Sequence, residues 1–158
     1  MKNIKVLLSS EKMDWETPQS FFDKLNDEFS FTLDPCATHQ NAKCKKYYTA
    51  GENGLLQSWV GEVVFCNPPY GLAIKDWVKK CHDEAINNNA TVVMLIPART
   101  DTSYFHQYIY NNPRAEIRFI KGRLKFGGDQ RSSNSAPFPS MIVIFKGENN
   151  GSNRLNQL

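Results

Sequence analysis

Short runs of apolar residues along the chain predict five β-strands. Two of them, residues 63–66 and 91–97, are continuously apolar, which is typical of strands buried on both faces of a parallel sheet. A third, residues 116–121, alternates between apolar and polar side chains, as expected for a strand with one exposed face. The remaining predicted strands lie at residues 31–35 and 140–145, and residues 45–49 have the composition of a further short strand.

Apolar residues three or four positions apart predict helices between these strands. The first helix starts at Thr17-Pro18, with Thr17 as the N-cap and Pro18 at the first helical position, and carries apolar residues from Phe21 to Phe29. The second carries apolar residues from position 74 to 85 and ends at Asn87-Asn88-Asn89, because asparagine is a poor helix former. A short third helix is expected at residues 103–110.

The order of the predicted elements indicates an α/β fold. Units of strand, helix and strand form parallel sheets, whereas residues 116–121 and 140–145 have no helix between them and are expected to pair antiparallel. We therefore predict a single doubly wound, Rossmann-like domain at residues 1–146, whose mostly parallel sheet has an antiparallel C-terminal strand. The polar residues 147–158 are predicted to form a disordered tail.

Composition argues against a membrane protein and a disulfide-rich one. No apolar run approaches the roughly 20 residues that a membrane helix needs, and the N-terminus lacks a signal-peptide pattern, which favours a cytoplasmic location. The four cysteines, at positions 36, 44, 66 and 81, match no disulfide framework, so reduced thiols are expected. Cys36-x-x-His39 with Cys44 resembles only part of a zinc site, so no metal is expected.

Charge is unevenly distributed, although the net charge is only +3. Residues 11–34 contain seven acidic and two basic residues, a balance of −5, and residues 118–131 contain five basic residues and one aspartate, a balance of +4. The basic segment continues into a long Gly-, Ser- and Asn-rich loop at residues 122–139, and loops of this length in compact domains are usually functional or disordered. If the strand before this loop runs parallel to its neighbours, the loop overhangs the carboxyl edge of the sheet.

The motif Asn67-Pro68-Pro69-Tyr70 directly follows the predicted strand at residues 63–66. Its prolines end the strand and stiffen the turn, because neither can donate a ladder hydrogen bond and each fixes its φ angle. Open α/β sheets bind ligands at such carboxyl ends of strands. The Asn67 side chain and the Pro68 carbonyl offer two acceptors for a planar amine, and Tyr70 offers a ring for stacking. An ordinary strand-ending turn would also account for these residues.

The motif resembles the catalytic motif of amino-group methyltransferases that use S-adenosylmethionine, and three further stretches make the resemblance more specific. Trp15-Glu16-Thr17-Pro18, Leu33-Asp34-Pro35-Cys36-Ala37 and Ala136-Pro137-Phe138-Pro139-Ser140 resemble, in this order, the phage-type DNA N-6-adenine methyltransferases, the phage Dam family. The resemblance spans about residues 13–146. It implies methyl transfer from S-adenosylmethionine to the exocyclic N6 amine of adenine in DNA. The implied setting is bacteriophage or restriction-modification DNA methylation in the cytoplasm of a bacterial host.

The resemblance also implies roles for individual residues. Asn67 and Pro68 would bind the amine, Pro69 would shape the turn, and Tyr70 would stack on a base that has left the DNA helix. A glycine-rich loop usually follows the first strand of methyltransferases, but here Ala37-Thr38-His39-Gln40 stands in its place. The implied cofactor-binding residues are Trp15, Thr17, Pro18, Asp34, Pro35, Cys36, Ala37, Asn53, Gly54, Leu55 and Asn67.

Basic residues near the predicted active-site edge are candidates for contacts with DNA phosphates. These residues are Arg99, Lys121, Arg123, Lys125 and Arg131. The chain leaves no room for a separate recognition domain, so we expect residues 99–103 and 122–139 to select the target, with short or relaxed specificity.

Three other interpretations account for part of the pattern. Enzymes that methylate RNA or a protein glutamine amide share the Asn-Pro-Pro-Tyr motif, the fold and the cofactor, but not the flanking stretches. A catalytically silent DNA-binding module would keep the fold and lose cofactor binding. A zinc-stabilised interaction domain would be revealed by metal analysis.

Overall fold

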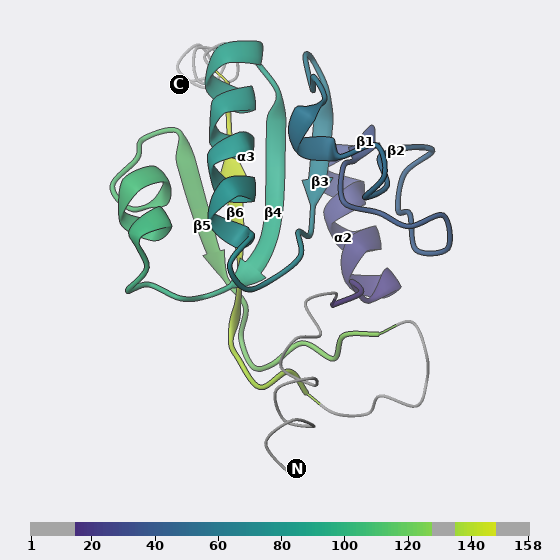
Figure 1. Cartoon of the computed structure of the whole chain (residues 1–158). Helices are drawn as coiled ribbons and strands as arrows, with labels where there is room; N and C mark the ends of the chain where they lie inside the picture. The colour runs from purple at the N-terminus through teal and green to yellow at the C-terminus, as the bar shows by residue number, and fades with distance from the viewer. Residues whose placement is uncertain (1–14, 128–134, 148–158) are drawn as a thin grey trace, which may run out of the picture.

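The computed structural model describes residues 15–127 and 135–147 and has a mixed α/β fold built on one sheet. Among these residues six strands are ordered β2-β1-β3-β4-β6-β5 (Figure 1). β1 to β4 run parallel, and β6 lies antiparallel between β4 and β5. The strands are β1 (Leu33–Asp34), β2 (Lys46–Tyr47), β3 (Val63–Cys66), β4 (Thr91–Pro97), β5 (Ala115–Phe119) and β6 (Ser140–Phe145). The mostly parallel sheet with an antiparallel C-terminal strand is therefore confirmed.

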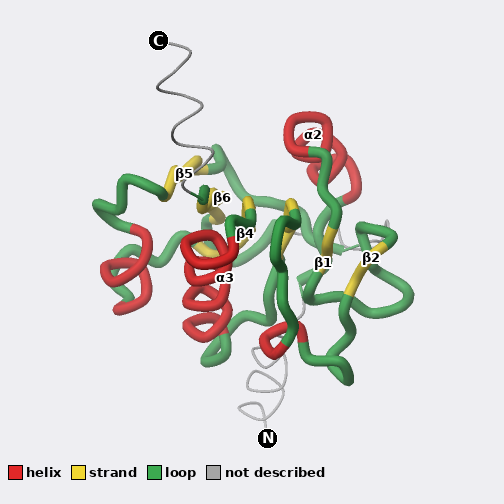
Figure 2. The backbone as a smooth tube through the Cα atoms, turned by 90° about the horizontal axis from the view of Figure 1, so that it is seen from above, coloured by secondary structure: helices red, strands yellow, loops and turns green. Residues whose placement is uncertain are grey.

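The two long helices, α2 (Gln19–Phe29) and α3 (Ile74–Asn88), lie on opposite faces of the sheet (Figure 2). Neighbouring residues of β3 show the same arrangement, because successive side chains of a strand point to opposite faces. Phe65 packs edge-on against Phe22 of α2 at 5.1 Å between ring centroids, whereas the thiol of the next residue, Cys66, lies beside the Cys81 thiol of α3. Two shorter helical turns, η1 (Gly54–Leu56) and η2 (Phe105–Ile109), follow β2 and β4.

The ends of the helices agree only in part with the predictions. α2 begins one residue later than expected, because Pro18 has a ψ of 133° and so lies outside the helix. Thr17 is therefore not the N-cap, and its hydroxyl bonds Asn67 instead. α3 ends as predicted: Asn89 has the left-handed φ of 53°, and its N–H bonds the Glu84 carbonyl. The third predicted helix is present as the π-helical turn η2, in which the Tyr110 N–H bonds the Phe105 carbonyl at 2.7 Å.

Strand β5 runs in the same direction as β4, because both are antiparallel to β6. It therefore ends at the edge of the sheet where β3 ends, as the sequence predicted. Beyond this edge the segment after β5 and the segment before β6 run side by side (Figure 1), and the Ala136 N–H bonds the Leu124 carbonyl at 2.8 Å. These two segments are the stems of the basic loop, whose residues 128–134 lie outside the described ranges.

The hydrophobic core is centred on β3, β4 and β6. Every side chain of β6 is buried, as are those of Val92 to Pro97 in β4, which explains why both strands read as continuous apolar runs. Trp59, Phe65 and Phe145 are the largest of the fully buried side chains. In the described ranges, no helix combines the length and the apolar character that crossing a membrane requires.

Candidate active site

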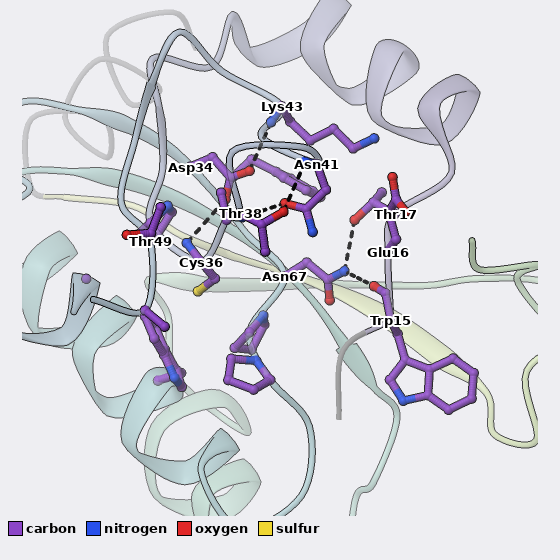
Figure 3. Close-up of a pocket in the computed structure, with 18 of the residues that line it drawn as sticks. Trp15, Glu16, Thr17, Asp34, Cys36, Thr38, Asn41, Lys43, Thr49 and Asn67 are labelled. Atoms are coloured by element: carbon purple, nitrogen blue, oxygen red, sulfur yellow. Dashed lines mark hydrogen bonds between the residues drawn. The ribbon is translucent and has the colours of Figure 1, made fainter. Parts of the chain in front are cut away.

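A cavity of about 1350 Å³ opens at the carboxyl ends of β1 and β3 (Figure 3). Segments far apart in the sequence line it: residues 15–17, the loop after β1, the turn before η1, the motif at residues 67–69 and both stems of the basic loop. Figure 3 shows Asn67 in the middle of this lining, with Asp34 on one side and Trp15 on the other. The position of the cavity agrees with the general rule for open α/β sheets.

Asp34 organises the loop that replaces the usual glycine-rich turn. Its side chain is only 5% exposed, and it accepts hydrogen bonds from the backbone N–H groups of Cys36 at 3.2 Å and Lys43 at 3.1 Å. Burial raises the pKa of the Asp34 carboxyl, and these two hydrogen bonds offset only part of that effect. The Lys43 ammonium donates to the Gln19 side chain and makes no hydrogen bond to Asp34. Among the described residues, the two donors to Asp34 are therefore backbone N–H groups. The carboxylate therefore favours a cation placed beside it in the cavity.

The turn at Asn53 and Gly54 packs tightly against the end of β1. Asn53 has a φ of 54°, and its side chain accepts a hydrogen bond from the Leu55 N–H at 3.2 Å. A Cβ atom at Gly54 would lie 2.3 Å from the Pro35 carbonyl oxygen, so only glycine allows this close approach. Local geometry accounts for both residues, and the same geometry brings Asn53, Gly54 and Leu55 to the cavity.

The Asn67 amide has a defined orientation. Its Nδ2 donates to the Trp15 carbonyl oxygen and, at 2.9 Å, to Thr17 Oγ1 (Figure 3). A carbonyl oxygen can only accept, so the atom facing Trp15 must be the NH₂ group and the Asn67 oxygen must point elsewhere. That oxygen, Oδ1, is buried and has no hydrogen-bond partner in residues 15–127 and 135–147. Buried polar atoms are normally satisfied, so an unpaired acceptor in a cavity lining indicates a site for a donor.

Tyr70 does not present its ring to the cavity, contrary to the expectation that this ring offers a surface for stacking. The side chain is 5% exposed, and its hydroxyl donates to the Leu95 carbonyl at 3.1 Å. Phe126 and Phe138, one from each stem of the basic loop, pack edge-on against the ring at 6.3 and 5.6 Å. The same two rings pack edge-on against Trp15, which lines the cavity. The loop stems therefore cover Tyr70, which the sequence of the motif could not indicate.

The predicted cofactor and catalytic residues are brought together with two exceptions. Pro18 and Tyr70 are absent from the cavity lining, and all the other predicted members of these two groups belong to it. The lining also includes residues that the sequence analysis did not assign to a site: Glu16, Thr38, Gln40, Asn41, Lys43, Thr49, Ala50, Phe65, Trp77, Phe126, Gly127, Ser135 and Pro137. Thr38 and Gln40 adjoin the predicted set in sequence, and Phe126 lies in the loop that was expected to overhang this edge of the sheet. No pattern in the sequence placed Trp77 at the site.

Four of the five predicted DNA-contacting residues lie outside the cavity, on the surface. Arg99, Lys121, Arg123 and Lys125 are exposed, and none of them lines the cavity. Arg131 lies outside the described residues. Arg118 contributed to the positive charge of this segment, but its guanidinium pairs with both carboxylate oxygens of Glu28 at 2.7 Å, and these hydrogen bonds raise its pKa.

The described residues contain no group of three or more His, Cys, Asp or Glu side chains that could hold a metal ion. In the segment that resembled part of a zinc site, His39 Nδ1 lies 2.7 Å from the Tyr47 hydroxyl. Cys36 instead approaches Cys66, with 3.6 Å between the sulfur atoms.

Comparisons with known proteins indicate the family of the chain. Residues 5–155 match the model of the family described as DNA N-6-adenine-methyltransferase (Dam). The chain is 33% identical over 113 residues to a DNA N-6-adenine-methyltransferase of Escherichia phage T1, an alignment that covers 70% of this chain and 45% of the phage protein. It is 40% identical over 63 residues to the putative methyltransferase YfdM of Escherichia coli K12, covering 35% of this chain and 69% of that protein. The chain thus spans less than half of the phage T1 relative.

Proposed function

The chain belongs to the DNA N-6-adenine-methyltransferase (Dam) family, and from this premise we propose that it methylates the N6 amine of adenine in DNA with S-adenosylmethionine as methyl donor. The name of the phage T1 relative and the geometry of the cavity support the proposal. We further propose a Rossmann-like, doubly wound domain at residues 1–146 that acts on DNA in the cytoplasm of a bacterial host.

The observation that carries the proposal is the unpaired Oδ1 of Asn67. An exocyclic amine has two N–H groups, and Asn67 Oδ1 together with the Pro68 carbonyl supplies two acceptors beside the stiff turn. The lone pair of the adenine amine is delocalised into the ring, so the nitrogen is a poor nucleophile. Two fixed acceptors favour a pyramidal nitrogen and stabilise the positive charge that develops on it during methyl transfer. No strong general base is required in this scheme.

At the end of the cavity opposite Asn67, the lining residues suit the two portions of S-adenosylmethionine. When bound, S-adenosylmethionine supplies a methyl group on a sulfonium, which is an excellent leaving group. The buried Asp34 carboxylate suits the cationic methionine portion. Residues 53–55 would hold the adenosine portion. Because placement of the reactants contributes up to ~7–11 kcal/mol to such reactions, this preformed lining is the main contribution of the chain.

The target base would enter at the Asn67 end of the cavity. In duplex DNA it must first leave the stack, which costs a few kcal/mol and requires new apolar contacts in the protein. Trp15 and Phe126 line this end and offer such contacts. Direct stacking on Tyr70 requires Phe126 and Phe138 to move away from its ring. The exposed Arg99, Lys121, Arg123 and Lys125 would contact phosphates, which predicts weaker binding as salt concentration rises.

The decisive experiment is transfer of labelled methyl from S-adenosylmethionine to unmethylated DNA, followed by nuclease digestion to identify the product. We expect N6-methyladenine from the wild type and from Asn87→Ala, which changes an exposed asparagine at the end of α3, but not from Asn67→Ala. Unlabelled DNA from a protein that binds the cofactor would contradict the proposed substrate and point to RNA or protein. Absence of cofactor binding would contradict the proposed reaction itself.

A further inference from the structure

Three thiols form a contiguous buried group beside the cavity. The sulfur atoms of Cys36 and Cys66 are 3.6 Å apart, and the Cys81 thiol lies beside Cys66. Cys66 and Cys81 are fully buried, whereas Cys36 is partly exposed and lines the cavity. The group therefore has one member that a small oxidant can reach through the cavity.

The topology of the sheet explains why Cys36 and Cys66 meet. β1 and β3 are adjacent parallel strands with Leu33 opposite Val64, so the residues that follow them leave the same edge side by side. Each cysteine adjoins a residue of the proposed site. The N–H of Cys36 binds the Asp34 carboxylate, and Cys66 directly precedes Asn67.

We propose that Cys36 and Cys66 are a modification site, which peroxide or a similar oxidant converts into a reversible disulfide that disables the cavity. A disulfide requires the sulfur atoms to approach to ~2.05 Å, so the 3.6 Å contact must contract by roughly 1.5 Å. Side-chain rotation and a small movement of the two strand ends can supply this change. Disulfides in cytosolic proteins are usually transient and redox-sensing, which is the behaviour proposed for this pair.

The proposed disulfide forms in two steps. Hydrogen peroxide oxidises the accessible Cys36 thiol to a sulfenic acid and is reduced to water. The Cys66 sulfur then attacks the Cys36 sulfur, forming the S–S bond and expelling a second water, which takes the proton of the Cys66 thiol. Burial raises the pKa of the Cys36 and Cys81 thiols. Cys66 is the attacking group because its sulfur is the one in contact with the Cys36 sulfur.

The consequence for methyl transfer rests on the proposed function. Drawing Cys36 towards Cys66 would displace the loop held by Asp34 and the residue before Asn67. A displacement of ~1 Å in such a site can lower a rate on the order of 100-fold. We therefore expect oxidation to abolish most of the methyl transfer, and dithiothreitol to restore it.

The test treats the purified full chain with hydrogen peroxide and maps disulfides in tryptic peptides under non-reducing conditions, alongside methyl transfer before and after dithiothreitol. We expect a Cys36–Cys66 disulfide, a loss of methyl transfer on the order of 100-fold, and recovery on reduction. Each variant is compared with its own untreated activity: Cys44→Ser, outside the thiol group, should stay sensitive to the oxidant, and Cys66→Ala should become resistant.

A Cys66–Cys81 disulfide, irreversible oxidation alone, or a Cys36–Cys66 disulfide without loss of methyl transfer would overturn the proposal. The peptide map and the reversal use the wild-type chain, so they do not depend on the folding of a variant. An untreated protein that transfers no methyl group would contradict the proposed function, whereas the peptide map would still decide whether the two thiols pair.

Discussion

The two ends of the cavity differ in how their polar groups are satisfied. At the end lined by residues 34–55, the Asp34 carboxylate and the Asn53 side chain accept hydrogen bonds from backbone amides within the same segment. At the other end, the Asn67 amide is held by Trp15 and Thr17, about fifty residues earlier, and its oxygen has no partner among the described residues. The proposed cofactor end is therefore shaped locally, whereas the proposed target end depends on distant segments and its Asn67 oxygen has no hydrogen-bond partner among the described residues.

Replacing Asn67 should give the largest effect, because it removes the unpaired acceptor itself. For Asn67→Ala we expect methyl transfer to fall by on the order of 100- to 1000-fold while S-adenosylmethionine binding, measured by calorimetry, stays close to the wild type. Asn67→Asp should also be severely impaired, since an ionised carboxylate cannot donate to the Trp15 carbonyl and repels it. Near-normal activity of Asn67→Asp would show that the orientation of the amide is unimportant.

Tyr70 tests whether the target end depends on packing. Tyr70→Ala removes a buried ring and should lower the free energy of unfolding by about 3–5 kcal/mol, together with most of the activity. Tyr70→Phe removes only the hydrogen bond to the Leu95 carbonyl and should cost about 1 kcal/mol. Chemical denaturation and methyl-transfer assays on both variants provide the measurement. Equal losses of activity in the two would contradict a role for the ring.

Asp34 gives the cofactor end a pH dependence. A cationic ligand binds the ionised carboxylate, and burial raises the pKa of this group in the folded chain. As the pH falls through that raised pKa the carboxyl takes up a proton, so affinity for S-adenosylmethionine should weaken by up to about tenfold per pH unit. Calorimetric titration from neutral to acidic pH measures this slope, which Asp34→Asn should flatten. An unchanged slope in Asp34→Asn would assign the effect to another group.

Thr17 should show the smallest effect, because the Trp15 carbonyl still holds the Asn67 amide. Thr17→Val keeps the shape but removes the acceptor, and losing one hydrogen bond of about 1 kcal/mol should lower kcat roughly fivefold. Thr17→Ser keeps the hydroxyl and serves as the matched control. If Thr17→Val weakened cofactor binding and left kcat unchanged, the hydroxyl would be a cofactor ligand and not a positioning group for Asn67.

The strands of the sheet could be predicted from the sequence, because the central strands are buried on both faces and therefore form continuous apolar runs. Thr17 shows the limit of local patterns, because Thr-Pro ahead of an amphipathic segment predicts an N-cap, whereas a contact fifty residues away uses the hydroxyl. Tyr70 and Arg118 show the same limit. Phe126 and Phe138 cover the tyrosine, and Glu28, ninety positions away, pairs with the arginine. Only the folded chain could show these contacts.

The acceptor that fixes the Asn67 amide at Trp15 belongs to the main chain. A main-chain carbonyl is present whatever the side chain, so mutational drift at position 15 can replace the indole without removing this hydrogen bond. The two functions of the residue are therefore separable: the backbone orients Asn67, and the indole contributes a wall of the cavity. Substitutions at position 15 among related sequences would therefore reflect only the requirement for a side chain that lines the cavity, and the orientation of the Asn67 amide would be kept.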